Sequence, residues 1–321
     1  MSRWRHVPRP GLAAARRRLV RSTDDWRSAR RQSRPSAAQA AYTGQVEICV
    51  YLPRMSRSTR TLWASLNTLG LAFALVCNGL ANALPLNGMN TGQISALYPN
   101  LFVPAGLTFA IWALIYSWLL VFAGAGFVAA RRDAERHVLE RIGPWFLINT
   151  LANGAWIFAW HWLMVPLSLA LMLVILTSLI AMYLRLGTGV YPADRLERWA
   201  LRAPISLYLG WITVATIANV TALAVELGAP KFGPLPTALT VLVIATAVAI
   251  TARMLVAHHD LIYTSVVCWA LLGIVLERSG APDEGSDVVL AAAATAFALL
   301  ALAACLIVLR ERQKRATARR A

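Results

Sequence analysis

Residues 203–225 read APISLYLGWITVATIANVTALAV, and this stretch decides the class of fold. It holds no Asp, Glu, Lys or Arg, and it is longer than the roughly 20 apolar residues that a helix needs to cross the hydrocarbon core of a bilayer. A charge at the bilayer centre would cost at least ~2.5 kcal/mol. The stretch can therefore insert as a transmembrane helix without a polar partner.

The rest of the chain repeats this pattern. Hydrophobic residues make up 58% of the sequence and charged residues 14%, with a mean hydropathy of +0.56, whereas soluble domains carry about a quarter charged residues. Apart from Asp287 at its edge, the set of candidate spans is uncharged. We predict an all-α fold, a polytopic membrane helical bundle with eight transmembrane helices, at about 62–84, 105–129, 144–161, 164–184, 203–225, 235–252, 261–276 and 287–309.

The net charge of +16 is concentrated at the two ends of the chain. Residues 1–60 contain 14 arginines and three acidic residues, and the segment from Arg310 contains six basic residues and Glu311. Basic segments beside a span set its orientation and are attracted to anionic lipid. We interpret both ends as cytoplasmic segments and expect no nucleic-acid partner.

The predicted loops support this orientation. The loops that follow the second and fourth spans are rich in arginine, and Arg253 follows the sixth. On the other side, 85–103 has no charge, 226–234 has Glu226 and Lys231, and 277–286 has an acidic excess. Basic loops thus alternate with neutral or acidic ones at successive crossings. The positive-inside rule then predicts that both termini lie in the cytoplasm.

The terminal segments are expected to lack a packed fold. Residues 1–60 form a basic, disordered N-terminal extension, because this stretch is rich in Arg, Ser, Ala and Pro without a sustained apolar period. Met55 stands directly before the first span, and we expect residues 1–54 to be dispensable. Residues 310–321 are expected to form a basic cytoplasmic tail.

Motifs for hydrolytic or metal chemistry are missing from the sequence. We find no acid pair, Ser/His/Asp set, phosphate-binding loop or metal-ligand spacing, and the four cysteines suggest no disulfide framework. His258, His259 and Asp260 are adjacent, so their side chains point apart. We therefore expect no metal and no obligate cofactor, and catalysis is not supported.

Aromatic and amide residues recur at helical spacing in three of the predicted spans. Residues at i, i+3, i+4 and i+7 share one face of a helix. The first stripe is Phe109, Trp112 and Tyr116; the second is Trp145, Asn149, Asn153, Trp156 and Trp160; the third is Tyr208, Trp211, Ala215 and Asn219.

Two interpretations compete for these stripes. The tryptophans could form a belt at the membrane interface while the asparagines link helices. Trp112, Trp156 and Trp211, however, lie well inside their spans, where a belt does not explain them. Because apolar pockets with a few polar groups commonly bind small molecules, we favour a ligand pocket.

The same residues resemble the TspO family, also called translocator protein, tryptophan-rich sensory protein or peripheral benzodiazepine receptor. The resemblance covers about residues 62–225. It is carried by Pro104-Ala105-Gly106 with Phe109, Trp112 and Tyr116, by Asn153-Gly154-Ala155-Trp156 with Pro166, and by Tyr208-Leu209-Gly210-Trp211 with Ala215-Thr216 and Asn219.

This resemblance divides the chain into a TspO-like five-helix module at 61–225 and three additional helices at 226–309. Spans six to eight have no counterpart in the five-helix family, and Trp160-His161 stands where that family has two phenylalanines. The pattern is similar to a longer bacterial branch. We therefore expect a multi-pass protein of the bacterial inner (plasma) membrane.

The resemblance also implies a cavity among the first, second, third and fifth helices, covered by the loop at 85–103. It implies tetrapyrrole ligands, such as protoporphyrin or haem, or sterol-like molecules. Asn78 and Asn82, one turn apart on the first span, could meet Asn153. The predicted ligand-binding residues are Trp112, Tyr116, Asn153, Trp156, Trp160, Tyr208, Trp211, Ala215, Asn219, Asn78 and Asn82.

The predicted function is that of a sensor or regulator that binds a tetrapyrrole or a related lipophilic ligand. A membrane transporter of such a metabolite is one alternative, and oxidative or light-driven porphyrin degradation is another. Expected partners are the lipid bilayer and a small lipophilic ligand, with a homodimer as a further option.

Overall fold

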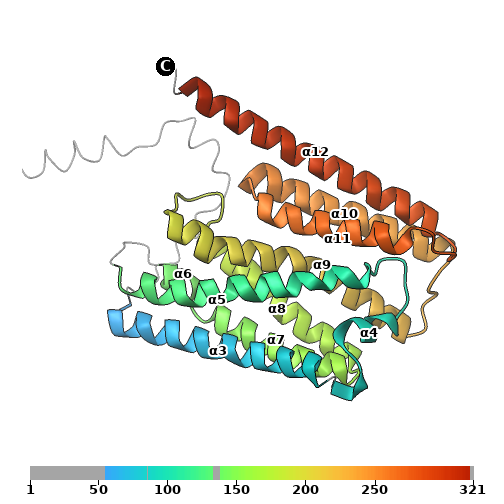
Figure 1. The fold of residues 1–321 in the computed structure, drawn as a ribbon, viewed down its shortest axis with the longest axis horizontal. Coiled ribbons are helices and arrows are strands. Elements are labelled where there is room, and N and C mark those ends of the chain that lie inside the picture. The colour runs from blue at the N-terminus through green and yellow to red at the C-terminus, as the bar shows by residue number, and fades with distance from the viewer. Residues whose placement is uncertain (1–54, 85, 133–137, 319–321) are drawn as a thin grey trace, which may run out of the picture. The chain divides into compact units, whose positions relative to one another are not determined.

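The computed structural model describes residues 55–84, 86–132 and 138–318, and these residues form helices joined by turns, with no strand among them (Figure 1). Most of the predicted N-terminal extension and the last three residues lie outside the described residues. The all-α, polytopic helical bundle predicted from the sequence is confirmed.

The described chain contains eight long helices and several short ones. The long helices are α3 (Arg57–Ala83), α5 (Ile111–Ala130), α7 (Trp145–His161), α8 (Val165–Leu186), α9 (Ala203–Glu226), α10 (Pro234–His258), α11 (Leu261–Arg278) and α12 (Ser286–Ala318). The short ones are η1 (Leu86–Gly88), α4 (Thr91–Ala96), η2 (Gly106–Ala110), α6 (Val138–Ile142) and η3 (Glu197–Arg202).

Seven of the eight long helices are long and apolar enough to cross a membrane by themselves. The exception is α7, which has 17 residues and lies at the lower end of the length that spans a bilayer. A tight turn through Leu163 joins α7 to α8, and the two helices pack against each other as an antiparallel hairpin. An eighth crossing at α7 stays a prediction.

Contacts between helix ends show the directions of several long helices. Arg60 at the start of α3 donates from Nη1 to the carbonyl of Arg132, just after α5, at 3.0 Å. At the other end of the bundle, Gly233 before α10 donates to the carbonyl of Glu284 before α12 at 3.4 Å. The start of α3 and the end of α12 consequently lie at the same end of the bundle (Figure 1).

Helix α9 occupies the centre of the bundle. All residues from 200 to 212 are buried, because α5, α8 and α11 each pack against α9. Helices α10, α11 and α12 lie together on one side of α9, and α3 and α7 lie on the other (Figure 1).

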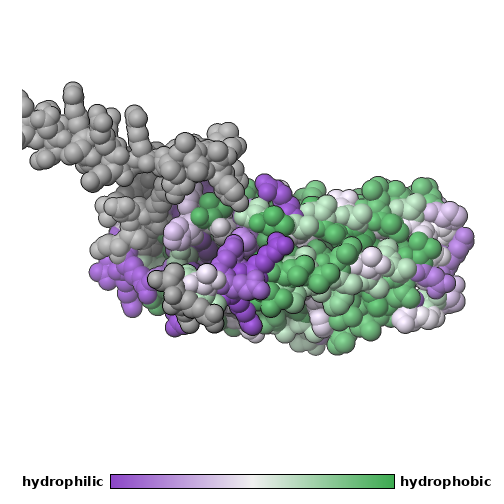
Figure 2. All heavy atoms as spheres, turned by 90° about the horizontal axis from the view of Figure 1, so that it is seen from above, coloured by the Kyte–Doolittle hydropathy of each residue, from purple (hydrophilic) through white to green (hydrophobic). Residues whose placement is uncertain are grey.

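The outer surface is strongly apolar between the two ends of the bundle. Figure 2 shows a broad hydrophobic band on the visible face, with hydrophilic residues toward both ends. Leu239 and Leu242 of α10 and Leu299 and Leu302 of α12 are all more than half exposed. Such a surface fits lipid as its surroundings.

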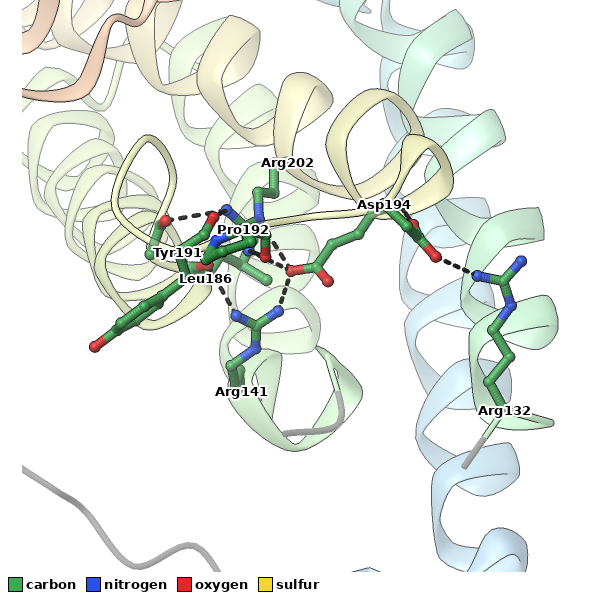
Figure 3. Close-up of polar contacts among 9 residues, drawn as sticks. Arg132, Arg141, Leu186, Tyr191, Pro192, Asp194 and Arg202 are labelled. Atoms are coloured by element: carbon green, nitrogen blue, oxygen red, sulfur yellow. Dashed lines mark hydrogen bonds and ion pairs between the residues drawn. The ribbon is translucent and has the colours of Figure 1, made fainter. Parts of the chain in front are cut away.

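Ion pairs and hydrogen bonds hold the connection between α8 and α9 in place at the end of the bundle where α3 begins (Figure 3). Glu197 forms ion pairs with Arg202, at 2.6 Å, and with Arg141. Arg202 also donates to the carbonyls of Gly187 and Tyr191, at 3.0 and 2.8 Å. These bonds satisfy a nearly buried guanidinium, which would be unfavourable without partners.

Candidate ligand-binding site

A pocket lies between the loop that contains α4, the η2–α5 junction, α7 and α9. Its empty volume is about 530 Å³ when its open mouth is included, and the part that admits water-sized molecules is about 40 Å³. Its own side chains therefore nearly fill it. Six of the predicted ligand-binding residues line it: Trp112, Trp156, Trp160, Trp211, Ala215 and Asn219.

Trp112 of α5 stands at the centre of an aromatic cluster. Its ring stacks on Trp156 of α7, with centroids 6.2 Å apart, and meets Trp211 of α9 edge to face, also at 6.2 Å. Tyr116 stacks on the same indole at 5.3 Å, and Tyr208 approaches its edge at 5.9 Å. These separations lie in the range in which aromatic pairs attract each other.

Helical periodicity explains how three helices bring these rings together. Trp156 and Trp160 lie one turn apart on α7, and their rings stack at 6.0 Å. Trp211 and Ala215 are likewise one turn apart on α9 and both line the pocket. Part of each predicted stripe thus lines the pocket, since residues four apart share a helix face.

A buried hydrogen-bond network centred on Asn153 lies beside the aromatic cluster. Asn153 donates from Nδ2 to the hydroxyl of Tyr208 at 2.8 Å. Its Oδ1 accepts from Asn78 at 2.9 Å and from the Tyr116 hydroxyl at 3.4 Å. The network joins α3, α5, α7 and α9, but these four residues are not among those that line the pocket.

Two indole N–H groups at the pocket lack a hydrogen-bond partner. Trp156 and Trp211 are buried, and neither Nε1 atom meets an acceptor. Trp160, by contrast, donates to the carbonyl of Thr91 at 3.3 Å. Because an unmade buried hydrogen bond is unfavourable, these two donors would gain from a ligand that carries acceptors.

The two remaining predicted amides have different surroundings. Asn219 lines the pocket and accepts a hydrogen bond from Ser168 of α8 at 2.6 Å. Asn82 lies in the last turn of α3, is exposed and donates to the Asn78 carbonyl at 2.9 Å. The structure therefore places Asn82 away from the pocket. The alternative role predicted for asparagine, linking helices, is seen at Asn149, which donates to Ser178 of α8 at 2.9 Å.

The pocket also includes residues that the sequence-based prediction missed. Thr91, Ser95 and Tyr98 come from the loop between α3 and α5, and Val103 and Pro104 follow in the same loop. The signals for them were the expectation that this uncharged loop covers a cavity and, for Pro104, its place in the Pro104-Ala105-Gly106 motif. Val214, Ala218 and Ala222 extend the α9 wall.

Tyr98 contributes a polar group to the lining of the pocket. Its ring lies 6.0 Å from that of Trp160. Burial raises the pKa of the Tyr98 phenol to about 12, and a hydrogen bond to Glu226 contributes to this shift. The phenol is therefore protonated at neutral pH. Across the described part of the chain, no group of three His, Cys, Asp or Glu side chains could hold a metal ion.

The fold and this pocket define a class of protein, a polytopic helical membrane protein with an aromatic pocket inside its bundle. The chain matches the family of TSPO-like proteins over residues 64–307 and belongs to that family. The matched region includes α5 to α11 entirely, and so extends beyond residue 225. Comparisons with curated proteins and with solved structures found no match.

Proposed function

We propose that this protein binds a flat lipophilic ligand of the tetrapyrrole class in the aromatic pocket and acts as a sensor or regulator of that ligand. The observation that carries the proposal is the cluster around Trp112, in which rings from three helices face one pocket. Indole faces can stack on a planar macrocycle and add about 0.5–1.5 kcal/mol per aromatic pair beyond the area buried.

The polar groups of the pocket also suit such a ligand. The N–H groups of Trp156 and Trp211 are unpartnered donors, and Thr91, Ser95 and Tyr98 bring hydroxyls from the loop. None of the lining residues is Lys or Arg, so ligand carboxylates would rely on these neutral donors or on water at the mouth. Tyr98 is the only titratable residue among those that line the pocket, and its raised pKa makes the phenol a weak acid, so the proposal assigns no general acid or base.

A tetrapyrrole can enter only if the pocket widens. The space open to water-sized molecules, about 40 Å³, holds at most a few waters, whereas drug-sized ligands occupy pockets of about 300–1,000 Å³. Aromatic side chains that now stack on one another would exchange those contacts for contacts with the macrocycle. Binding should therefore alter tryptophan emission.

The test is a titration of the purified protein in detergent with protoporphyrin. Saturable quenching of tryptophan emission and a shift of the porphyrin absorbance band are expected. Replacing Trp112→Phe together with Trp211→Phe should weaken binding about five- to tenfold, because two extended indole surfaces are lost. Absorbance is the decisive signal here, since it does not depend on which tryptophans remain.

The matched control is Trp199→Phe. Trp199 is exposed and lies in η3, outside the pocket, so this variant should bind with the affinity of the unmodified protein. Equal affinity of the double variant and the control would rule out the pocket as the binding site. Absence of saturable binding in all three proteins would rule out the ligand class.

A further inference from the structure

Two hydrogen bonds fasten α11 to a wall of the pocket. The backbone N–H of Ala105 donates to the carbonyl of Gly273 at 3.0 Å. The indole N–H of Trp269 donates to the carbonyl of Thr108, also at 3.0 Å. Both acceptor–donor pairs join α11 to the stretch around η2, and the neighbouring residues Pro104 and Phe109 line the pocket.

Gly273 allows this close approach. A Cβ atom built on Gly273 would lie 2.9 Å from the Cβ of Pro104 and would overlap the Cγ2 of Thr108. Thr108 is buried, with 1% of its surface exposed, so it has little room to move aside. Any side chain at position 273 would consequently push α11 away from η2.

The same helix also packs on α9, which forms another wall of the pocket. A Cβ atom on Gly210 of α9 would lie 3.0 Å from the Cβ of Val266 and 3.2 Å from the carbonyl oxygen of Tyr263. The Tyr263 hydroxyl donates to Thr213 at 3.1 Å. Gly210 directly precedes Trp211, a lining residue. Helix α11 therefore bridges the η2 wall and the α9 wall.

We propose that α11 is a clamp on the pocket, with Trp269 and Gly273 as positioning residues that hold the η2 wall against α9. Because the pocket is nearly filled, a large ligand must displace its walls, and the bonds from α11 oppose this displacement. The clamp thereby sets how fast a ligand enters. Its effect on tetrapyrrole binding rests on the proposed function, whereas the clamp itself can be measured without any ligand.

The first measurement is the accessibility of the pocket. In a full-length protein whose native cysteines are replaced by alanine, Ala215→Cys places a thiol on the pocket wall, and its rate of reaction with a small maleimide reports opening. Adding Trp269→Phe removes the N–H donor to Thr108 but keeps an aromatic ring. We expect labelling to become about fivefold faster, the effect of losing one hydrogen bond.

Trp118→Phe is the matched control. Trp118 lies on α5 and donates its indole N–H to a backbone carbonyl, that of Trp199, at 2.9 Å. It is not a lining residue. The control therefore loses the same kind of bond away from the pocket, and its labelling rate should stay that of the parent.

A second pair of variants tests the close approach of Gly273. Gly273→Ala should also speed labelling, and adding Thr108→Ser should bring the rate back toward that of the parent, because serine lacks the obstructing Cγ2. This rescue would not follow from a general loss of stability. If Gly273→Ala fails to fold, Trp269→Phe still decides the question.

The ligand measurement separates the two proposals. If the clamp controls entry, the association rate of protoporphyrin should rise about fivefold in Trp269→Phe and stay unchanged in Trp118→Phe. Faster labelling with no porphyrin binding in any variant would support the clamp and reject the proposed ligand. Labelling at the parent rate in Trp269→Phe and in folded Gly273→Ala would overturn the clamp, whatever the ligand result.

Discussion

At the scale of single residues, Glu197 is the carboxylate that pairs with two nearly buried arginines. Its Oε1 accepts from the guanidinium groups of Arg141 and Arg202, whose side chains are only 12% and 5% exposed. Removing the partner of a buried charge is far more harmful than removing an exposed pair, because the remaining charge cannot be solvated.

We therefore predict that Glu197→Gln destabilises the protein by about 3 kcal/mol and lowers the thermal unfolding midpoint measured in detergent. Asp194→Asn is the control. Its ion pair with Arg132 is more than half exposed on both sides and so contributes at most about 1 kcal/mol, and asparagine keeps an oxygen that can accept from the Glu197 N–H. Equal midpoints for the two variants would mean that water screens the Glu197 cluster.

Single residues also show what the sequence could and could not predict about the site. Helical spacing placed Trp112, Trp156 and Trp211 correctly at one pocket, because the period of a helix fixes which residues share a face. The same spacing paired Asn82 with Asn78, but α3 ends at Ala83, and Asn82 is exposed in the last turn of that helix. Tyr98 was missed because a loop has no periodicity from which its direction can be predicted.

At the scale of elements, close packing between α3 and α7 depends on glycine. A Cβ atom on Gly70 of α3 would lie 2.5 Å from Oγ1 of Thr150 on α7, whereas one on Gly79 of the same helix would meet nothing within 4 Å. Small residues let membrane helices approach closely. Because both glycines lie in the same helix but only Gly70 is in a tight contact, comparing them distinguishes close packing from helix propensity.

Gly70→Ala is expected to destabilise the protein by about 1–3 kcal/mol, the range for overpacking a tight contact. Gly79→Ala should be neutral or slightly stabilising, because alanine favours helices over glycine. Both midpoints can be compared by thermal unfolding in the same detergent. The interpretation fails if Gly70→Ala unfolds at or above the midpoint of Gly79→Ala.

The central position of α9 could not be predicted from its sequence. In a soluble protein, polar residues mark the outer face of a helix, but lipid tails are as apolar as leucine. An apolar helix that contacts lipid, such as α10, and one that is enclosed, such as α9, therefore have similar sequences. The predicted spans agree with the positions of these helices along the chain. Which helices pack against each other, such as α11 on α9, could be seen only in the tertiary structure.

At the scale of the whole molecule, the two ends of the bundle differ in charge. The end that holds the start of α3 and the end of α12 carries the arginine-rich loops. The opposite end has four acidic residues, Glu226, Glu277, Asp283 and Glu284, against Lys231 and Arg278. Arginine and lysine near membrane spans favour the cytoplasmic side. We predict that the arginine-rich end, with both chain termini, faces the cytoplasm.

Fusions to reporters test this orientation. Alkaline phosphatase is active only outside the cytoplasm, and green fluorescent protein serves as the complementary reporter. Fusions after Pro282, between α11 and α12, should show phosphatase activity, and fusions after Ala321 should show fluorescence. Phosphatase activity at the C-terminus would reverse the predicted orientation, and the same reporter result at both sites would mean that α12 does not cross.

The short helix α7 supplies the most demanding test of the predicted topology. Because α7 and α8 form a hairpin, fusions after Gly143 and after Leu163 should report opposite sides, cytoplasmic and then external, if α7 crosses. If its 17 residues instead leave both sites on one side, seven crossings remain and the two ends of the chain would face opposite sides. The charges of the loops favour the first outcome, since a missing crossing at α7 would place the arginines after α8 on the opposite side from those after α5, together with the uncharged loop at 85–103.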